Sequence, residues 1–216
     1  MIIPDTVNAQ FVKVFTELIK ERVSGGRRFV IVAGGGKTAR TYQAGLKEIG
    51  LTDPKALDWI GIYATHLNAE VLRLTFGELA HPEVLKNPEK RVNWKTPILV
   101  GGGGIPGWST DYDAILLAKM YGADSAINIS NIDYVYTADP KKDPAAKPIP
   151  QITWTQLIPM LPREWSPGLS SPFDPIAARM AQKLNLKVSI VNGASLDNVA
   201  QAIDGLPFRG TVITPV

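Results

Sequence analysis

Apolar residues recur at different spacings in different segments of this chain, and the spacing predicts the secondary structure. Between residues 7 and 24 they recur every three or four positions, which is typical of an amphipathic helix. Residues 29–33 and 97–100 are instead short unbroken apolar runs, which indicate strands that are buried on both faces. Two or more glycines follow each of these three segments and mark its end.

The pattern continues along the chain as an alternation of strands and helices. It predicts strands over residues 29–33, 97–100, 125–129, 188–191 and 211–213, and helices over residues 7–24, 37–49, 54–79, 110–121, 172–184 and 196–203. Residues 81–95 and 139–150 are polar and contain prolines, so they are expected to be surface connections. Strands that alternate with helices form βαβ units. We therefore expect an α/β fold, a three-layer α/β/α sandwich with a mostly parallel central sheet.

Length and composition exclude several kinds of protein. The chain has 216 residues, which suits one domain, and no repeat or linker divides it. It contains no cysteine, which excludes disulfides and thiolate metal sites, and its two histidines disfavour a histidine-rich metal site. A net charge of +3 is too small to argue for a nucleic acid polymer as partner. No signal peptide or 18-residue apolar stretch is visible, so we expect a cytoplasmic protein without a membrane partner.

Two glycine runs follow predicted strands, and both are candidate ligand sites. Residues 34–36 follow the strand at 29–33, and residues 101–104 follow the strand at 97–100. In an open α/β sheet, ligands bind beyond the carboxyl ends of the strands, and glycine lets a ligand approach the backbone N–H groups. The helix after each run adds its positive N-terminal end. Two such runs favour two phosphate-bearing ligands, and the alternative is a pair of tight turns without a ligand.

The first run matches no standard nucleotide motif completely. Gly36-Lys37-Thr38 resembles the end of a P-loop, but that motif needs a glycine where this chain has Ile31. The glycines at 34 and 36 fit the loose dinucleotide fingerprint, which then requires a second strand. Residues 40–60 are helical in pattern instead. Dinucleotide binding is therefore the weaker alternative.

Charged and hydroxyl side chains follow both runs. Lys37 and Arg40 stand in the first turn of the helix after the first run, where the helix dipole disfavours cations. A phosphate bound between them would explain their position, and two solvated surface cations are the alternative. After the second run, Ser109 and Thr110 are suited to cap the next helix or to hold a second phosphate. Asp113 is suited to cap that helix or to help hold a magnesium ion, and capping is favoured.

A third polar segment, residues 130–140, follows the predicted strand at 125–129. Within it, Tyr136 is suited to stack on a base, and Asp139 to accept a hydrogen bond from an amino or hydroxyl group. Taken alone, this segment could equally be an ordinary loop.

In this order, the three segments resemble the amino-acid-kinase family, and within it the archaeal-type uridylate kinases. The family's GGGKxAR pattern is similar to residues 34–40, and its GxxPGxTTD turn to residues 103–111. Its TNVDGVYTADPKKDP segment, the most specific of these motifs, resembles residues 130–144. Later motifs resemble residues 170–179 and 210–213, so the likeness covers nearly the whole chain.

The resemblance implies a kinase that transfers the γ-phosphate of ATP to UMP in pyrimidine nucleotide biosynthesis, with Mg²⁺ as a cofactor. It also implies an acceptor-binding lobe over residues 1–122, an ATP-binding lobe over residues 123–216, and a homo-oligomer, either a dimer or a hexamer.

The resemblance further implies a set of site residues. Catalytic roles fall to Arg40 and to Asp133, which would orient a magnesium ion or a lysine, and no residue is assigned as a metal ligand. Contacts with ATP fall to Gly36, Arg40, Ser130, Asn131, Tyr136 and Asp139. Gly35 would meet the acceptor phosphate, Asp58 the ribose, and the rest of the acceptor would be enclosed by Gly104, Ile105, Pro106, Gly107, Trp108, Ser109 and Thr110.

The chain departs from the family pattern in several places. The family opens with a strand and a Gly-Gly-Ser loop that wraps the ATP phosphates, and this chain starts beyond that point, so we expect a sheet that lacks one strand. Tyr134 takes the place of a glycine and Ser130 that of a threonine, while Ile105 and Trp108 replace polar residues near the acceptor. Two alternatives remain: a kinase of another small phosphate or carboxylate on the same fold, and a non-catalytic protein that binds a nucleotide or an oxyanion.

Overall fold

The computed structural model describes residues 2–3, 6–164 and 171–215, and in it the chain forms two compact units. The first unit runs to Met120 and the second begins at Tyr121. Each unit has its own sheet. Ser170, which belongs to one of the family-like segments, lies outside the described residues.

The first unit combines a parallel strand pair with helices. Strands β1 and β2 pair with Val32 opposite Gly101. Local sequence sets two helix starts, because Asn8 caps α1, and Asp53 caps α3 with a proline in its first turn. The elements are α1 (Ala9–Ser24), β1 (Phe29–Val32), α2 (Gly36–Glu48), α3 (Pro54–Phe76), the 3₁₀ turn η1 (Gly77–Leu79), β2 (Ile98–Gly101) and α4 (Thr110–Tyr121).

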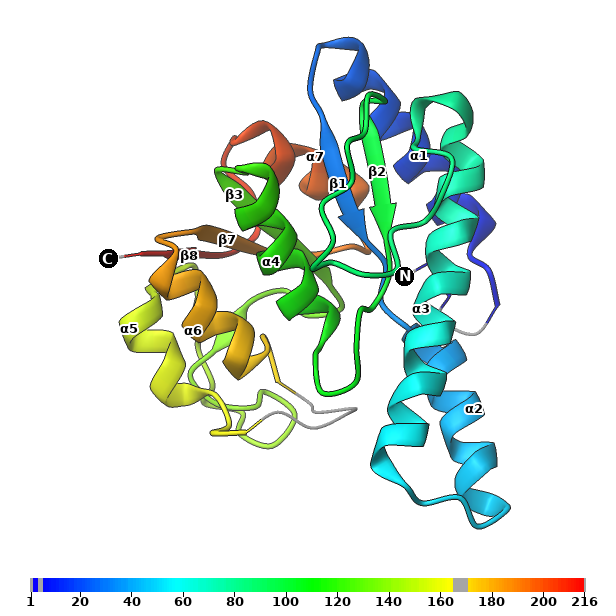
Figure 1. The fold of residues 1–216 in the computed structure, drawn as a ribbon. Coiled ribbons are helices and arrows are strands. Elements are labelled where there is room, and N and C mark those ends of the chain that lie inside the picture. The colour runs from blue at the N-terminus through cyan, green and yellow to red at the C-terminus, as the bar shows by residue number, and fades with distance from the viewer. Residues whose placement is uncertain (1, 4–5, 165–170, 216) are drawn as a thin grey trace. The chain divides into compact units, whose positions relative to one another are not determined.

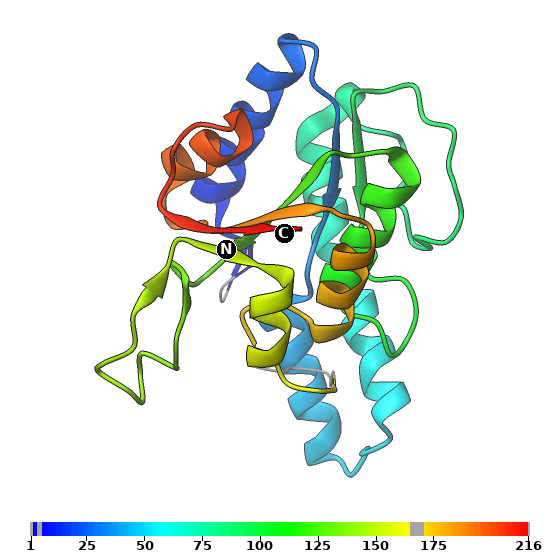
Figure 2. The same ribbon diagram turned by 90° about the vertical axis from the view of Figure 1, so that its left-hand side faces the viewer.

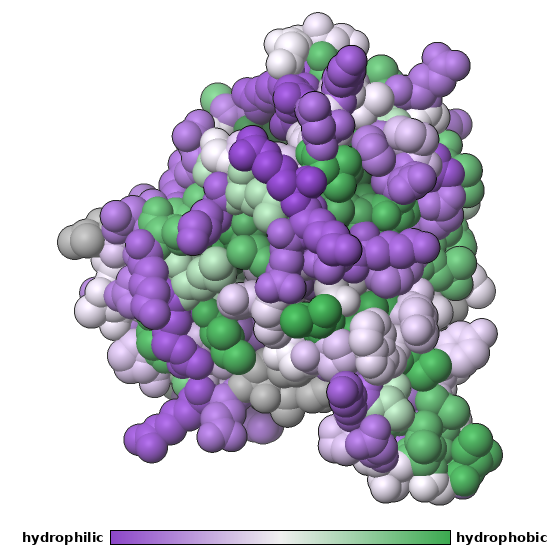
Figure 3. Space-filling view, viewed as in Figure 1, coloured by the Kyte–Doolittle hydropathy of each residue, from purple (hydrophilic) through white to green (hydrophobic). Residues whose placement is uncertain are grey.

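Helix α3 is the helix around which the first unit is built. It packs on β2, while α1 packs against it and α2 runs antiparallel beside it (Figure 1). Its buried face includes Ile62 and Leu72, and β2 residues such as Leu99 are completely buried. The far end of the α2–α3 pair is different, because Ile49 and Leu51 are exposed and the surface there is apolar (Figure 3).

The second unit holds a four-stranded sheet in the order β3-β7-β8-β6. Strand β7 runs parallel to β3 and antiparallel to β8, and β6 runs parallel to β8. Strands β4 and β5 form a separate antiparallel pair. The elements are β3 (Ser125–Ser130), β4 (Val135–Tyr136), β5 (Pro148–Ile149), β6 (Gln151–Thr153), α5 (Trp154–Leu157), the 3₁₀ turn η2 (Ile158–Met160), α6 (Pro175–Lys183), β7 (Lys187–Asn192), α7 (Leu196–Asp204) and β8 (Gly210–Thr214).

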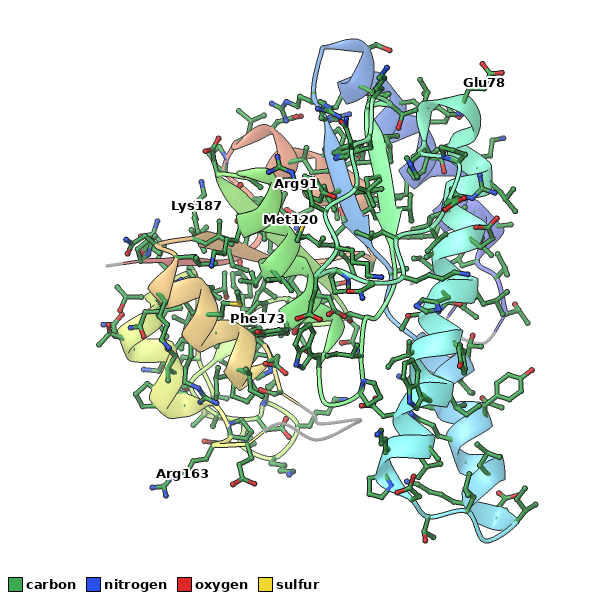
Figure 4. All side chains as sticks on the ribbon, in the orientation of Figure 1. Glu78, Arg91, Met120, Arg163, Phe173 and Lys187 are labelled. Carbon is green, nitrogen blue, oxygen red and sulfur yellow. The ribbon has the colours of Figure 1, made fainter. Side chains whose placement is uncertain are left out.

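Helices cover both faces of this sheet. Figure 2 shows α7 on one side of it and α5 with α6 on the other. On the α7 side, Val191 and Val199 are fully buried together with partly buried neighbours such as Phe208. On the other side, the fully buried Trp154 packs against Phe173 at 5.6 Å between ring centroids, and its indole N–H donates to Leu186 O (Phe173 is labelled in Figure 4).

The α/β class with mostly parallel strand pairing, predicted from the sequence, is confirmed. Each predicted strand and helix is present, with ends that differ by a few residues. Pairing within the described residues forms separate sheets in the two units rather than one continuous sheet. The pattern missed β4, β5, β6 and α5, because elements of two to four residues are too short to show a periodicity. No helix among the described residues is long and apolar enough to span a membrane.

Candidate functional site

The two glycine runs lie next to each other because β1 and β2 are adjacent parallel strands. Val32, the last residue of β1, is paired with Gly101, and Ala33 N donates to Gly101 O at 2.9 Å. A Cβ added at Gly34 would lie 3.6 Å from Thr110 Oγ1, at the start of α4. The prediction that both runs sit at neighbouring strand ends is therefore confirmed.

The first glycine run, Gly34 to Gly36, leads directly into the N-terminus of α2. Gly36 adopts a φ of +58°, which favours glycine, and a Cβ at Gly35 would lie 2.6 Å from Ala39 Cβ. Within the described residues, the N–H groups of Gly34, Gly35 and Gly36 donate to no protein acceptor. Unpaired N–H groups at a helix N-terminus are suited to bind an anion, so the run has the properties expected of a phosphate site.

The side chain of Asn68, on α3, is hydrogen-bonded to the first run. Its amide Nδ2 donates to Gly34 O at 2.7 Å and to Gly35 O at 3.1 Å, and the side chain is 1% exposed. Its Oδ1 is buried and has no hydrogen-bond partner among the described residues. The carbonyl groups of Gly34 and Gly35 therefore bond to α3, while the N–H groups of the run bond to none of the described residues.

The second glycine run, Gly101 to Gly104, is bonded differently. Gly102 N donates to Leu85 O, Gly103 N to Thr65 Oγ1 at 2.6 Å, and Gly104 N to Asp113 Oδ2 at 3.0 Å. His66 adds a bond of 2.8 Å between its Nε2 and Gly103 O. The N–H groups of this run therefore already have protein acceptors, and this bonding does not support the interpretation that they hold a second phosphate.

Helix α3 also holds the loop that follows the second run. Asp58 Oδ2 accepts a hydrogen bond from Gly107 N at 2.6 Å. Burial raises the pKa of Asp58, and the Gly107 bond partly offsets this effect. The Asp58 Oδ1 atom has no recorded partner in the described part of the chain, so one carboxylate oxygen remains available to a ligand.

The remaining predicted acceptor residues continue this loop into α4. Ile105 and Pro106 are half-buried, and the ring of Trp108 packs on Tyr112 at 4.7 Å between centroids. Ser109 caps α4, because its Oγ accepts from Tyr112 N at 3.1 Å. Of the two roles expected for Ser109, capping or phosphate binding, the structure shows the capping bond.

Asp113 does not cap α4, so that prediction was wrong. Its carboxylate reaches back to Gly104 N instead, and its other oxygen, Oδ1, is buried without a partner. The side chain is 0% exposed. Burial raises its pKa to about 7; the Gly104 bond opposes this shift and the nearby charge of Asp58 adds to it.

Arg40 lies in the first part of α2, one turn beyond the first glycine run. Its side chain is exposed and has no partner recorded among the described residues. Lys37 precedes it in the same turn, with its backbone N 3.5 Å from Ile3 O. A cation at this end of a helix is unfavourable on its own, so the geometry agrees with a role toward an anion.

In the second unit, the predicted segment at 130–140 follows β3. Both carboxylate oxygens of Asp133 accept hydrogen bonds. Oδ1 accepts from Asn192 Nδ2 at 2.8 Å, and Oδ2 accepts from Arg209 Nη2 at 3.1 Å in an ion pair. Its partner is therefore an arginine rather than a lysine. Arg209 is itself fixed, because its backbone N and O both bond to the side-chain amide of Asn198.

The other predicted residues of this segment have separate surroundings. Ser130 ends β3 and its carbonyl accepts from Gly193 N, while Asn131 is exposed. Tyr136 in β4 meets Tyr134 edge to face at 6.3 Å between centroids. The Asp139 carboxylate accepts from Lys141 N at 3.0 Å, so it shapes its own loop.

The residues present do not form a metal cage. The described residues contain no group of three or more His, Asp or Glu side chains placed to hold an ion. Both oxygens of Asp133 are engaged by Asn192 and Arg209. Because Mg²⁺ is commonly held through substrate phosphates and water, a magnesium ion would fit here only together with a bound nucleotide.

Sequence reasoning missed three α3 residues, Thr65, His66 and Asn68, that position the glycine runs. The available signal was their polarity within a helix that is otherwise apolar over this stretch. A buried polar side chain needs a partner, so polar positions in an apolar helix indicate a contact with another backbone segment.

The sequence and the fold are similar to those of known proteins. The sequence profile described as "Amino acid kinase family" matches residues 3–192. A uridylate kinase of Thermococcus kodakarensis is 36% identical over 223 aligned residues, which cover all of this chain and 96% of the relative, and one of Hyperthermus butylicus is 34% identical over 94% and 90%. The crystal structure of uridylate kinase from Archaeoglobus fulgidus superposes with a TM-score of 0.84 at 32% identity, covering 96% of this chain and 94% of that one.

Proposed function

This chain belongs to the amino acid kinase family, and from that membership we propose that it is a UMP kinase, which transfers the γ-phosphate of ATP to UMP in pyrimidine nucleotide biosynthesis. The full-length similarity to archaeal uridylate kinases carries the proposal. The first glycine run supports it independently, because its N–H groups, at the N-terminus of α2, have no acceptor within residues 2–3, 6–164 and 171–215.

We assign the acceptor to the first unit. The phosphate of UMP binds the N–H groups of Gly35 and Gly36, and this assignment replaces the contact with ATP that the resemblance implied for Gly36. Arg40 is the neighbouring cation. The free oxygen of Asp58 accepts a hydrogen bond from a ribose hydroxyl, while its other oxygen holds Gly107. The loop at 104–110 encloses the rest of the nucleotide, through the side chains and carbonyls rather than through the N–H groups of Gly104 and Gly107, which are already bonded.

We assign ATP to the second unit. Ser130, Asn131, Tyr136 and Asp139 lie along the segment that follows β3, with Tyr136 offering a ring face to a base. In the same segment, the carboxylate of Asp133 forms an ion pair with Arg209. The corresponding acceptor-binding and ATP-binding lobes are residues 1–122 and 123–216.

The reaction is an in-line phosphoryl transfer. An oxygen of the UMP phosphate attacks the γ-phosphorus, the bond from that phosphorus to the β,γ-bridging oxygen breaks, and ADP leaves while UDP forms. The attacking phosphate is already an anion, so no general base is needed, and the protein contributes position and charge neutralisation. Arg40 supplies positive charge at the transferred group. Mg²⁺ that arrives with ATP would neutralise part of the phosphate charge, and no residue is assigned as its ligand.

A homo-oligomer, either a dimer or a hexamer, is part of the proposal. Tyr63, Leu67 and Leu74 stand 59%, 57% and 63% exposed on α3. Their spacing of four and seven residues places them on one stripe of that helix, and such a stripe is suited to pack against a second copy. Light scattering would test this, and a monomer at micromolar concentration would contradict it.

A cytoplasmic location is proposed on the ground of function alone.

The kinase proposal is tested with ATP and a panel of acceptors: UMP, CMP, isopentenyl phosphate, carbamate and glutamate derivatives. ADP release coupled to a reporter should be fastest with UMP. Arg40→Ala should lower turnover at least about tenfold, whereas Lys47→Ala, which removes a cation from the last turn of the same helix, should leave it unchanged. Binding of nucleotides without any ADP release would identify a non-catalytic binding protein instead, and an equal effect of both variants would refute the role of Arg40.

A further inference from the structure

The side chain of Asn68 bridges two consecutive carbonyl groups of the first glycine run. Nδ2 lies 2.7 Å from Gly34 O and 3.1 Å from Gly35 O, so both amide hydrogens are used. The opposite orientation of the amide would set Oδ1 against two carbonyl oxygens, so the network itself determines which atom is which.

These two bonds fix the direction of two neighbouring peptide planes. In a trans peptide, the C=O of one residue and the N–H of the next point in opposite directions, and no described peptide is cis. Because Asn68 draws the carbonyls of Gly34 and Gly35 toward α3, the N–H groups of Gly35 and Gly36 point away from α3. Neither N–H group donates to an acceptor in the described part of the protein.

The run depends on this anchor because glycine alone does not choose a peptide orientation. A Cβ at Gly35 would collide with Ala39, and Gly36 has a positive φ, so both positions need glycine. Glycine, however, also permits the flipped peptides in which the carbonyls would face an incoming anion. For the Gly34 carbonyl, the Asn68 donor on the α3 side excludes that alternative. For the Gly35 carbonyl, it acts together with the backbone N–H of Ala39, which donates to Gly35 O at 3.1 Å.

The unpaired atom of Asn68 points to the same conclusion. Oδ1 is buried and has no hydrogen-bond partner in the described part of the chain, which costs free energy that an apolar side chain at this position would avoid. A residue that served only to fill space would not need an amide, so the donor half of the side chain is what the position requires.

We propose that Asn68 is a positioning residue that presets the N–H groups of Gly35 and Gly36 as a pair of donors for the phosphate of the acceptor. The inference rests on the proposed function, since it assigns the phosphate of UMP to that pair. Asn68 does not touch the ligand in this account. It acts through the orientation of two peptide groups.

Backbone amide NMR tests the proposal on the full chain, with inorganic phosphate, UMP and uridine as probes. In the wild type, phosphate and UMP should shift the amide signals of Gly35 and Gly36, and uridine should not. Asn68→Asp is nearly isosteric but replaces the donor by an acceptor that repels both carbonyls. It should abolish both shifts and raise the KM for UMP about tenfold or more, with the KM for ATP changed less than about twofold.

Leu72→Ala is the matched control, because it removes buried contacts one turn further along α3 without touching the amide bonds. A role in stability alone would weaken phosphate binding equally in Leu72→Ala and Asn68→Asp, and that result would overturn the proposal. If Asn68→Asp does not fold, Asn68→Ala removes the donor without adding charge. Unchanged amide shifts in Asn68→Ala would also overturn it.

The outcomes separate this inference from the kinase assignment. A wild-type chain that does not phosphorylate UMP but shows the two amide shifts, lost in Asn68→Asp, would refute the kinase proposal and support the role of Asn68. An active wild type whose Asn68→Asp variant keeps both amide shifts and the KM for UMP would support the kinase proposal and refute the role of Asn68.

Discussion

Replacing Asp113 by asparagine should change the pH dependence of stability in a calculable way. Asp113 is fully buried, holds Gly104 N through Oδ2, and leaves Oδ1 without a partner. Asparagine keeps an oxygen acceptor for Gly104 N and cannot ionise. Any cost of burying its unpaired amide hydrogens is the same at every pH, so only the ionisation of aspartate can make the difference between the two proteins vary with pH.

The magnitude follows from the pKa of Asp113, which burial raises from 3.8 to about 7. The folded state binds the proton more tightly than the unfolded state, so wild-type stability falls as the pH rises from about 4 to about 7 and is flat above that. The total loss is about 4 kcal/mol, because each pH unit between the two pKa values corresponds to about 1.4 kcal/mol. Between pH 5 and pH 8 the loss is about 2.5 kcal/mol.

Chemical unfolding followed by circular dichroism, at pH 5 and pH 8, measures this. The stability of Asp113→Asn relative to the wild type should rise by about 2.5 kcal/mol between the two pH values. Asp124→Asn, which removes an exposed carboxylate, is the control and should show a change within about 0.5 kcal/mol. A stability difference between Asp113→Asn and the wild type that is equal at both pH values would show that Asp113 is not a buried titrating group.

Two further predictions concern the glycine run and the second unit. Gly36→Ala should destabilise the fold by about 1 kcal/mol or more, because φ is +58° and the new Cβ would lie 3.2 Å from Ile3 O. Gly45 lies within the same helix, and a Cβ added there would have nothing within 4 Å. Gly45→Ala should therefore stabilise the fold by up to about 1 kcal/mol. Thermal unfolding measures both variants, and a less stable Gly45→Ala than Gly36→Ala would contradict this strain argument. Asn198→Ala removes both hydrogen bonds that fix the backbone of Arg209. It should raise the KM for ATP several-fold and leave the KM for UMP unchanged. Equal changes in the two KM values would argue against the assignment of ATP to the second unit.

In the first unit, side chains of α3 and α4 hold several backbone segments in place. Thr65 and His66 clamp Gly103 from both sides, through its N–H and its carbonyl respectively. Asn68 holds the first run, and Asp58 holds the loop after the second run. A substitution on α3 can therefore alter both glycine runs at once, and double-mutant cycles between Thr65 and Asn68 would measure the coupling.

Most of the element pattern could be predicted because it follows from local spacing. The start of α4 at Thr110 and its end at Tyr121 were predicted from the sequence and agree with the structure. Strands β1 and β2 were visible as apolar runs, since strands buried on both faces lack polar positions. The position of the two glycine runs at adjacent strand ends then followed from the parallel pairing rule.

The candidate site was predicted less completely than the fold. Arg40, Asp58 and the 104–110 loop were named from motifs, and their assigned contacts with nucleotides remain proposals. The motifs could not show that Asp58 bonds Gly107 N or that Asp133 pairs with Arg209, 76 residues further along the chain. Such partners are separated by long stretches of sequence, and no local spacing records them.

The sequence by itself determined where the chain turns, because glycine runs and apolar periodicity act over a few residues. It also determined the family, through motifs that keep their order along the chain. Only the tertiary structure decided which N–H groups are available. Both runs consist of glycine alone, yet N–H groups of the second run are bonded to Leu85, Thr65 and Asp113. Those of the first run have no acceptor among the residues that the structure describes. The difference arises because a backbone donor is free or paired according to which side chains the fold brings within about 3 Å of it.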